Sequence, residues 1–393
     1  MFLIAVKFPT GISSSQKPIL TWHGKLLHKA WISARMIITI QTLSEERKAW
    51  DMILSGEPGI KSMEESDFIM VTGIGLISGG LDSILAARVL QDQGIRVIGI
   101  SFVTPFFGAE KAERAAAMLK MELRVMDITQ AHLEMLQSPK YGYGKEMNPC
   151  IDCHALMFHE AGKVMESEGA DFLFSGEVLG ERPMSQNRQS LMNVARDSGY
   201  KDYIIRPLSA LFLPETLPER EGKVDRKKLL NIEGRSRRRQ MELASYYGIT
   251  EYPQPASGCL LTEPGYARRL KELMQHTPIL ESRDVQLLGA GRHFRLDTGD
   301  KVIVGRDQND NEKLLSMKDK TDVVLDVRDY PSPIAIIPHG ASKESVAKAA
   351  AICVRYSDAP RDKEVAVIYN RGEEKLTLSV KALPNEELDK IRI

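Results

Sequence analysis

Residues 74–83, IGLISGGLDS, hold the first set of side chains that could do chemistry. An apolar run leads into Ser78-Gly79-Gly80-Leu81-Asp82-Ser83, and an amphipathic run follows through residue 93. Two adjacent glycines allow the backbone to turn tightly and to come close to a ligand. The serine hydroxyls and the amides at the start of the following helix can then face phosphate oxygens. Asp82 can cap that helix or hold a Mg²⁺ that bridges phosphates.

The spacing of this loop differs from the two common phosphate-binding patterns, GxxxxGK[ST] and GxGxxG. From the residues alone, the loop is therefore either a phosphate-binding turn of another kind or a plain strand-to-helix turn.

Three of the four cysteines form the second chemical signal. Cys150 and Cys153 have CxxC spacing at the start of a predicted helix, which puts both sulfurs on one side of a turn. A helix N-terminus lowers the pKa of a thiol and favours the thiolate that metal ligation and nucleophilic attack require. Cys259 lies in a later loop beside a glycine, so only folding can bring it to the other two. Cys353 lies in an alanine-rich stretch and is predicted to be a core residue.

The run SGGLDS, placed directly after a strand, resembles the pyrophosphate loop of the N-type ATP pyrophosphatase family. Enzymes of this family cut ATP between its α and β phosphates and use the AMP to activate a carbonyl. The resemblance implies Mg²⁺ as a cofactor, a catalytic role for Asp82 and an adenine contact at Phe102, largely through its backbone. It implies ATP binding by Ser78, Gly79, Gly80, Asp82 and Ser83.

A second stretch, GEVLGERPMSQ at residues 176–186, resembles the loop that lines the nucleotide and substrate pocket of 4-thiouridine synthetases. This resemblance places Gly176 at the expected ATP site. The run IIRPL at 204–208 matches the same relatives, and Arg206 is interpreted either as a phosphate contact or as a surface arginine.

The order of loop, CxxC and later cysteine resembles that of iron–sulfur tRNA thiolation enzymes, in which three cysteines ligate a [4Fe-4S] cluster. The resemblance implies that Cys150, Cys153 and Cys259 are cluster ligands and that one iron stays open. Asn148-Pro149-Cys150 also resembles the catalytic segment of the 2-thiouridylases, which implies a persulfide on Cys259 that Cys150 resolves. The third alternative is structural zinc with a fourth ligand such as His154.

These side chains need a scaffold, and residues 70–284 show a regular alternation of strands and helices. Strands are predicted at 73–77, 96–103, 122–127 and 171–177, and helices at 81–93, 109–120, 150–168 and 263–275. Such alternation predicts an α/β fold with a doubly wound parallel sheet. Ligands bind beyond the carboxyl ends of its strands, so the loop at Ser78 and the strand end at Phe102 are expected at one edge.

Residues 285–393 are predicted to form a smaller α+β domain. The pattern indicates a hairpin from His293 to Arg306, strands at 323–327, 334–338, 364–369 and 375–380, and a helix from the N-cap Ser342 to about residue 355. The runs VGRDQN at 304–309 and IAII at 334–337, with the helix and Tyr-Ser at 356–357, resemble the RNA-binding domain of the NFACT family. That resemblance implies RNA contacts at Arg292, Arg295 and Arg306. The alternative is an oligomerisation module.

A basic cluster at residues 223–243 includes Arg237 and Arg238. It predicts either a contact with the tRNA backbone or a solvated helix face.

Length, charge and cysteine content limit the number of domains, the mode of nucleic-acid binding and the expected location of the protein. A chain of 393 residues with a formal net charge of zero suggests two or three domains and confines any nucleic-acid contact to local patches. Four cysteines are too few for a disulfide framework, and the chain has neither a long apolar run nor a secretory signal, so a cytoplasmic location is expected. Residues 1–69, which hold all three tryptophans, are either a small accessory region or sequence upstream of a start at Met70.

Together these features predict an ATP-dependent tRNA sulfurtransferase that adenylates a base carbonyl and replaces its oxygen with sulfur. Its expected partners are tRNA and a sulfide or persulfide donor, and a homodimer is allowed. Two rival functions are an amide- or nitrile-forming ligase with zinc at the cysteines and an RNA-binding protein whose loop senses nucleotide.

Overall fold

The computed structural model describes residues 70–253, 259–372 and 374–393. The predicted N-terminal extension, residues 1–69, therefore lies outside the described residues. The first sheet has five strands in the order β3-β2-β1-β4-β5, and every pairing in it is parallel. Its strands are β1 (Thr72–Leu76), β2 (Arg96–Val103), β3 (Glu122–Asp127), β4 (Phe172–Ser175) and β5 (Ile204–Ile205). The prediction of a doubly wound parallel sheet is confirmed.

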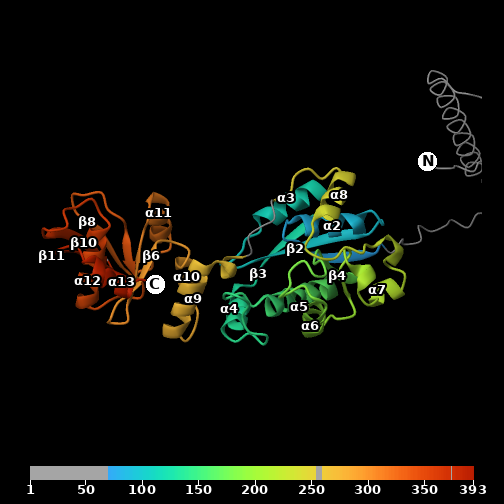
Figure 1. Cartoon of the computed structure of the whole chain (residues 1–393), viewed down its shortest axis with the longest axis horizontal. Coiled ribbons are helices and arrows are strands. Elements are labelled where there is room, and N and C mark those ends of the chain that lie inside the picture. The colour runs from blue at the N-terminus through green and yellow to red at the C-terminus, as the bar shows by residue number, and fades with distance from the viewer. Residues whose placement is uncertain (1–69, 254–258, 373) are drawn as a thin grey trace, which may run out of the picture. The chain divides into compact units, whose positions relative to one another are not determined.

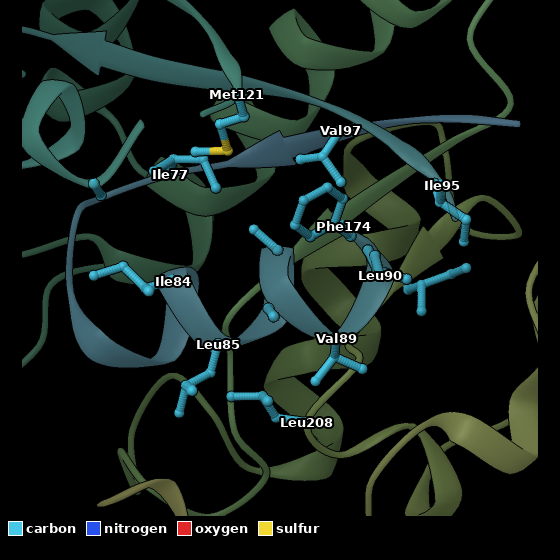
Figure 2. Packing of buried hydrophobic residues seen from close by; sticks show 14 of the residues in the cluster. Ile77, Ile84, Leu85, Val89, Leu90, Ile95, Val97, Met121, Phe174 and Leu208 are labelled. Carbon is cyan, nitrogen blue, oxygen red and sulfur yellow. The ribbon is translucent and has the colours of Figure 1, made fainter. Parts of the chain in front are cut away.

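Helices cover both faces of this sheet (Figure 1). One face carries α2 (Leu81–Gln91), α3 (Glu110–Leu119) and α8 (Arg238–Tyr246). The other face carries α5 (Cys150–Glu168) and α6 (Arg188–Asp197), and α4 (Thr129–Gln137) contacts α5. Figure 2 shows side chains of α2 packed among Ile77, Val97 and Phe174. This packing fixes the position of the helix that follows the Ser78–Ser83 loop.

Most predicted elements appear within a few residues of their expected bounds. The helix expected at 81–93 ends at Gln91, because Gly94 adopts a positive φ of 81° that turns the chain toward β2. The strand expected at 171–177 ends at Ser175, because the chain turns at Gly176 against the start of α2. The helix α5 begins at Cys150 and ends before Gly169, which has a left-handed conformation.

A third cluster of apolar side chains lies around α9 (Pro264–His276) and joins it to α4 and α10 (Ser282–Leu287). Phe106, Leu136 and Leu261 belong to this cluster, so it also holds the short helix η3 (Leu260–Thr262) that follows Cys259. The remaining short helices are η1 (Ala210–Phe212), α7 (Leu217–Arg220) and η2 (Arg226–Lys228).

The second sheet has six antiparallel strands in the order β11-β10-β8-β9-β7-β6. Its elements are β6 (Arg292–Arg295), β7 (Lys301–Val304), α11 (Gln308–Ser316), β8 (Val323–Val327), β9 (Ala335–Ile337), α12 (Lys343–Arg355), β10 (Val365–Arg371), β11 (Glu374–Val380) and α13 (Asn385–Ile391). The expected hairpin is confirmed as β6 and β7, and the Ser342 side chain caps α12 by accepting from the Ser345 amide. The smaller α+β domain is confirmed as a fold, whereas its proposed boundary at 284/285 falls inside α10 and stays a prediction. Cys353 is buried in this core, as expected.

Among the helices that the structure describes, none combines the length and the apolar character needed to cross a membrane.

Candidate nucleotide and cysteine site

The loop after β1 is closed by its own hydroxyls. The Ser83 hydroxyl donates to the Gly80 carbonyl oxygen at 2.8 Å and lies 3.4 Å from the Ser78 hydroxyl. Gly79 has a φ of 73°, and a Cβ there would lie 2.2 Å from the carbonyl carbon of Lys111. Only glycine fits this close approach between the loop and α3. The amides of the loop are thereby fixed at the carboxyl edge of β1, where ligands of parallel sheets bind.

Asp82 lies on the first turn of α2 beside Arg237, whose guanidinium Nη2 is 3.7 Å from the Asp82 carboxylate. Burial raises the pKa of Asp82, although the charge of Arg237 acts in the opposite direction. Within the described residues, the buried Oδ1 of Asp82 and the buried Nε of Arg237 have no hydrogen-bond partner. A carboxylate oxygen and a guanidinium N–H left open at a glycine-rich loop match the needs of Mg²⁺ and phosphate.

The placement of Arg237 was not foreseen. The sequence groups it with Arg238 as an RNA contact, but 81% of the Arg237 side chain is covered against 15% of Arg238. Its second neighbour is Glu181, at 4.0 Å, which belongs to the 176–186 loop. No signal in the sequence separates the two arginines, because only the packing of α8 against α2 aims one of them at the loop.

Gly176 and Glu177 join the nucleotide loop to the helix that carries two cysteines. A Cβ on Gly176 would lie 2.4 Å from the backbone of Asp82, so the two segments touch. The next residue, Glu177, accepts a hydrogen bond from Nδ1 of His154 at 2.7 Å. His154 follows Cys153 directly on α5. This contact occupies Nδ1 of His154 and leaves the zinc role that one alternative gave it to Nε2, since metal-ligating histidines commonly bond a carboxylate through their other ring nitrogen.

Glu177 is a buried carboxylate held by three donors. Arg206 Nε donates to it at 2.9 Å and the Ser175 hydroxyl at 3.0 Å, in addition to His154. Burial alone would raise its pKa, but the charge of Arg206 and the bond from His154 lower the pKa of Glu177 to about 2. Arg206 is only 5% exposed, so the surface interpretation of this arginine is wrong.

The fold brings the three predicted cysteines together. Cys150 and Cys153 lie on the first turn of α5, and Cys259 directly precedes η3, which is held by a hydrogen bond from the Leu260 amide to the Phe106 carbonyl. Burial raises the pKa of Cys153 well above its usual value, and the charges of Cys259 and Cys150 raise it further. Burial also raises the pKa of Cys259. The expectation of a low thiol pKa at the start of α5 is therefore wrong for Cys153, because desolvation outweighs the helix N-terminus.

Each sulfur on α5 has a nitrogen neighbour. The Asn148 side-chain amide donates to Cys150 Sγ at 3.2 Å, and His132 Nε2 lies 3.4 Å from Cys153 Sγ. His132 was not singled out from the sequence, in which it is one histidine on a short helix of mixed polarity.

In the part of the chain that the structure describes, no group of three or more His, Cys, Asp or Glu side chains is arranged to hold a metal ion. A cation placed among these thiols would stabilise their thiolate forms.

The remaining predicted residues lie elsewhere. Phe102 is 5% exposed and its ring packs in the core, which leaves only its backbone for a ligand. Arg292 donates to the Gly305 carbonyl and lies 4.6 Å above the Tyr356 ring, while Arg306 pairs with Asp310 at 2.5 Å. A cavity of about 580 Å³ at the end of β2 includes Phe106 and Leu260, the residue after Cys259.

Two family models match this chain. Residues 68–212 match the family described as thiamine biosynthesis protein (ThiI), and residues 291–392 match the NFACT protein RNA-binding domain. Residues 68–212 thus form a ThiI-like domain, and residues 291–392 form an NFACT-type domain.

Curated proteins also match parts of this chain. The tRNA-specific 2-thiouridylase MnmA of Clostridium acetobutylicum is 33% identical over 140 residues, which are 31% of this chain and 39% of that protein. The probable tRNA sulfurtransferase of Thermococcus kodakarensis is 29% identical over 177 residues, 39% of this chain and 45% of that protein. The chain spans between 31% and 39% of the length of the first curated relatives that it matches.

Among solved structures, a 4-thiouridine synthetase–RNA complex with bound ATP covers 56% of this chain and 52% of its own, at 21% identity and a TM-score of 0.33.

Proposed function

We propose that this chain, which joins a ThiI-like domain to an NFACT-type RNA-binding domain, is an ATP-dependent tRNA sulfurtransferase. ATP and Mg²⁺ bind at Ser78–Ser83, and sulfur chemistry takes place at Cys150, Cys153 and Cys259.

The observation that carries this proposal is the short link between the two sites. Gly176 touches the backbone of Asp82, and its neighbour Glu177 binds His154, which adjoins Cys153. Arg182, from the same 176–186 loop, lies close enough for its charge to act on both Asp82 and Cys259. A nucleotide loop and a set of thiols held this close suit a reaction in which one activates a carbonyl and the other replaces its oxygen.

In the first step, the carbonyl oxygen of an RNA base attacks the α-phosphorus of ATP, and the bond to the β-phosphate oxygen breaks. Pyrophosphate leaves and the base becomes an O-adenylate. Asp82 would hold a Mg²⁺, which would supply positive charge to the phosphates, and Arg237 beside it is placed to donate to the leaving pyrophosphate. The target base must be unstacked to reach the loop.

In the second step, a sulfur nucleophile attacks the activated carbon, and AMP leaves with the former carbonyl oxygen. The three cysteines would hold a [4Fe-4S] cluster, and that group would supply iron for binding sulfide. A persulfide on Cys259 is the route that needs no cluster.

The test of the reaction is incubation of the full chain with ATP, Mg²⁺, sulfide and unmodified tRNA, followed by nucleoside mass spectrometry and pyrophosphate measurement. We expect one thionucleoside per pyrophosphate released. Pyrophosphate release without sulfur in the RNA, even with a persulfide donor, would exclude sulfur transfer. ATP binding without any pyrophosphate release would favour a nucleotide-sensing RNA-binding protein.

The test of the metal is anaerobic purification followed by a visible spectrum and iron and zinc analysis. A brown protein that loses iron on Cys259→Ala, but keeps it on Cys353→Ala, supports the cluster. A colourless, iron-free protein that still thiolates tRNA points to the persulfide, and stoichiometric zinc favours the ligase.

A further inference from the structure

His132 occupies a position in α4 where an apolar side chain would pack equally well. It is 0% exposed and shares the buried face of its helix with Leu133 and Leu136. Its ring lies between two phenylalanine rings, with centroids 5.2 Å from Phe106 and 5.7 Å from Phe107. Burying an imidazole in such surroundings has a free-energy cost that packing alone does not offset.

Among the described residues, the one polar contact of the His132 ring is with a cysteine of the candidate site. Nε2 lies 3.4 Å from Cys153 Sγ, within hydrogen-bond range for sulfur. The other ring nitrogen, Nδ1, is buried and has no hydrogen-bond partner among the described residues.

These two facts determine where the proton of the ring lies. A neutral imidazole carries one N–H and one bare nitrogen, so only one of the two ring nitrogens can donate. A buried N–H without an acceptor costs more than a bare acceptor, and unpaired buried N–H groups are correspondingly rarer. The proton therefore belongs on Nε2, where it can be donated to the sulfur.

We propose that His132 is a positioning residue of the cysteine site, which donates a hydrogen bond from Nε2 to Cys153 Sγ and holds that sulfur in one orientation. The N–H of His132 adds no net charge to the apolar surroundings of Cys153. Its hydrogen bond favours a negatively charged Sγ over a neutral one. With Asn148 donating to Cys150, both sulfurs of the CxxC segment receive an N–H. The consequence for sulfur transfer rests on the proposed function, whereas the hydrogen bond does not.

The contact is tested in the full chain, reduced and freed of metal, by timed alkylation with iodoacetamide at pH 7 and mass spectrometry of each cysteine peptide. His132→Phe keeps a ring between Phe106 and Phe107 but removes the donor. We expect the rate at Cys153 to fall about tenfold, with changes below twofold at Cys150 and Cys259. His132→Gln, which retains an N–H, should recover part of the loss. His159→Phe is the matched control, because His159 lies on α5 and bonds the Ser198 carbonyl instead of a cysteine.

An unchanged or higher rate at Cys153 in His132→Phe overturns the proposal, and so does an equal loss at all three cysteines. Nitrogen-15 NMR of the wild-type imidazole gives an independent answer even if the variant does not fold. A protonated Nε2 and a bare Nδ1 at pH 7 support the assignment, and the opposite tautomer overturns it.

The positioning role of His132 can be tested separately from the proposed function. If the wild type thiolates tRNA, His132→Phe should lower kcat about tenfold and leave the KM for ATP unchanged. If the wild type does not thiolate tRNA but shows the Nε2–H tautomer, the proposed function fails while the positioning role of His132 stands.

Discussion

At the scale of single residues, two adjacent arginines have different surroundings. Arg237 is largely covered and approaches Asp82, whereas Arg238 is 85% exposed and pairs with Glu242 one helical turn away. A charge held near a glycine-rich loop acts on bound phosphate, while a solvated charge acts on a polyanion at longer range. The two side chains should therefore affect different ligands.

Arg237→Ala should weaken ATP binding by 10- to 100-fold, about 1.5–3 kcal/mol, since it removes a hydrogen bond to a charged group. Arg238→Ala should leave the ATP affinity unchanged and lower the salt dependence of tRNA binding by about one unit of slope. Isothermal titration with ATP, and tRNA binding at several salt concentrations, measure the two effects. Equal ATP affinities for the two variants would show that Arg237 does not reach the nucleotide.

The lowered pKa of Glu177 predicts how the free energy of unfolding depends on pH. Its pKa falls from 4.5 in the unfolded chain to about 2 in the fold, so its ionised form is stabilised by folding. The contribution to the free energy of unfolding is fully present above about pH 4.5 and disappears as the pH falls toward 2. Glu177→Gln should destabilise the protein by on the order of 3 kcal/mol at pH 7, because it leaves the buried Arg206 without its partner.

Urea unfolding of the wild type and Glu177→Gln at pH 7 and pH 3 measures this difference. We expect the gap between the two proteins to shrink at pH 3. A gap that is the same at both values would mean that Glu177 is not ionised in the fold.

At the scale of elements, the site is built where three segments meet. The start of α2, the turn after β4 and the first turn of α5 meet through Gly176 and Glu177. The sequence predicted each of these elements, because glycines, a CxxC and apolar runs mark their ends. It could not predict the contacts among them, since Gly176 and Glu177 gain their roles from residues far away in the chain.

The elements that were missed are short. Helix α4 carries His132 but has only nine residues, and α6, α11 and α13 are also brief. Short helices have weak periodicity and are stabilised by tertiary packing more than by their own sequence. Arg206 follows the two-residue strand β5. Its burial depends on the contact with Glu177, so the sequence could not distinguish it from a surface arginine.

Gly176→Ala tests the junction of the three segments. Its Cβ would lie 2.4 Å from the backbone of Asp82, so α2 or the turn must shift, at a cost of about 1–3 kcal/mol. We expect a lower melting temperature and weaker ATP binding. Gly265→Ala is the control, because its nearest neighbour is a flexible arginine tip at 3.7 Å and the added methyl should be neutral or slightly stabilising. Equal melting temperatures for the two variants would contradict the close contact.

At the scale of the whole molecule, the formal net charge is zero, so a general attraction for RNA is absent. Binding must come from local groups, and the predicted ones in the NFACT-type part are Arg292, Arg295 and Arg306. Half of the Arg306 side chain is exposed although it pairs with Asp310, so it can still face a phosphate.

Arg306→Ala should weaken tRNA binding at low salt and reduce the slope of log affinity against log salt by about one. Arg96→Ala, which breaks an exposed pair with Glu122 at the start of β2, should leave that slope unchanged. Filter binding between low and moderate salt measures both slopes. A slope unaffected by Arg306→Ala would remove this residue from the RNA-binding surface.

The separation of the cysteines along the chain has a consequence during synthesis. Cys150 and Cys153 leave the ribosome well before Cys259, which follows only after β4, β5 and α8 have been made. At common elongation rates of about 5–20 residues per second, the delay is on the order of 5 to 20 s. For that time a nascent chain presents a pair of thiols without their third partner, and such a pair is open to oxidation or to capture of the wrong metal. Cells that make this protein should therefore gain active product when translation takes place under reducing conditions.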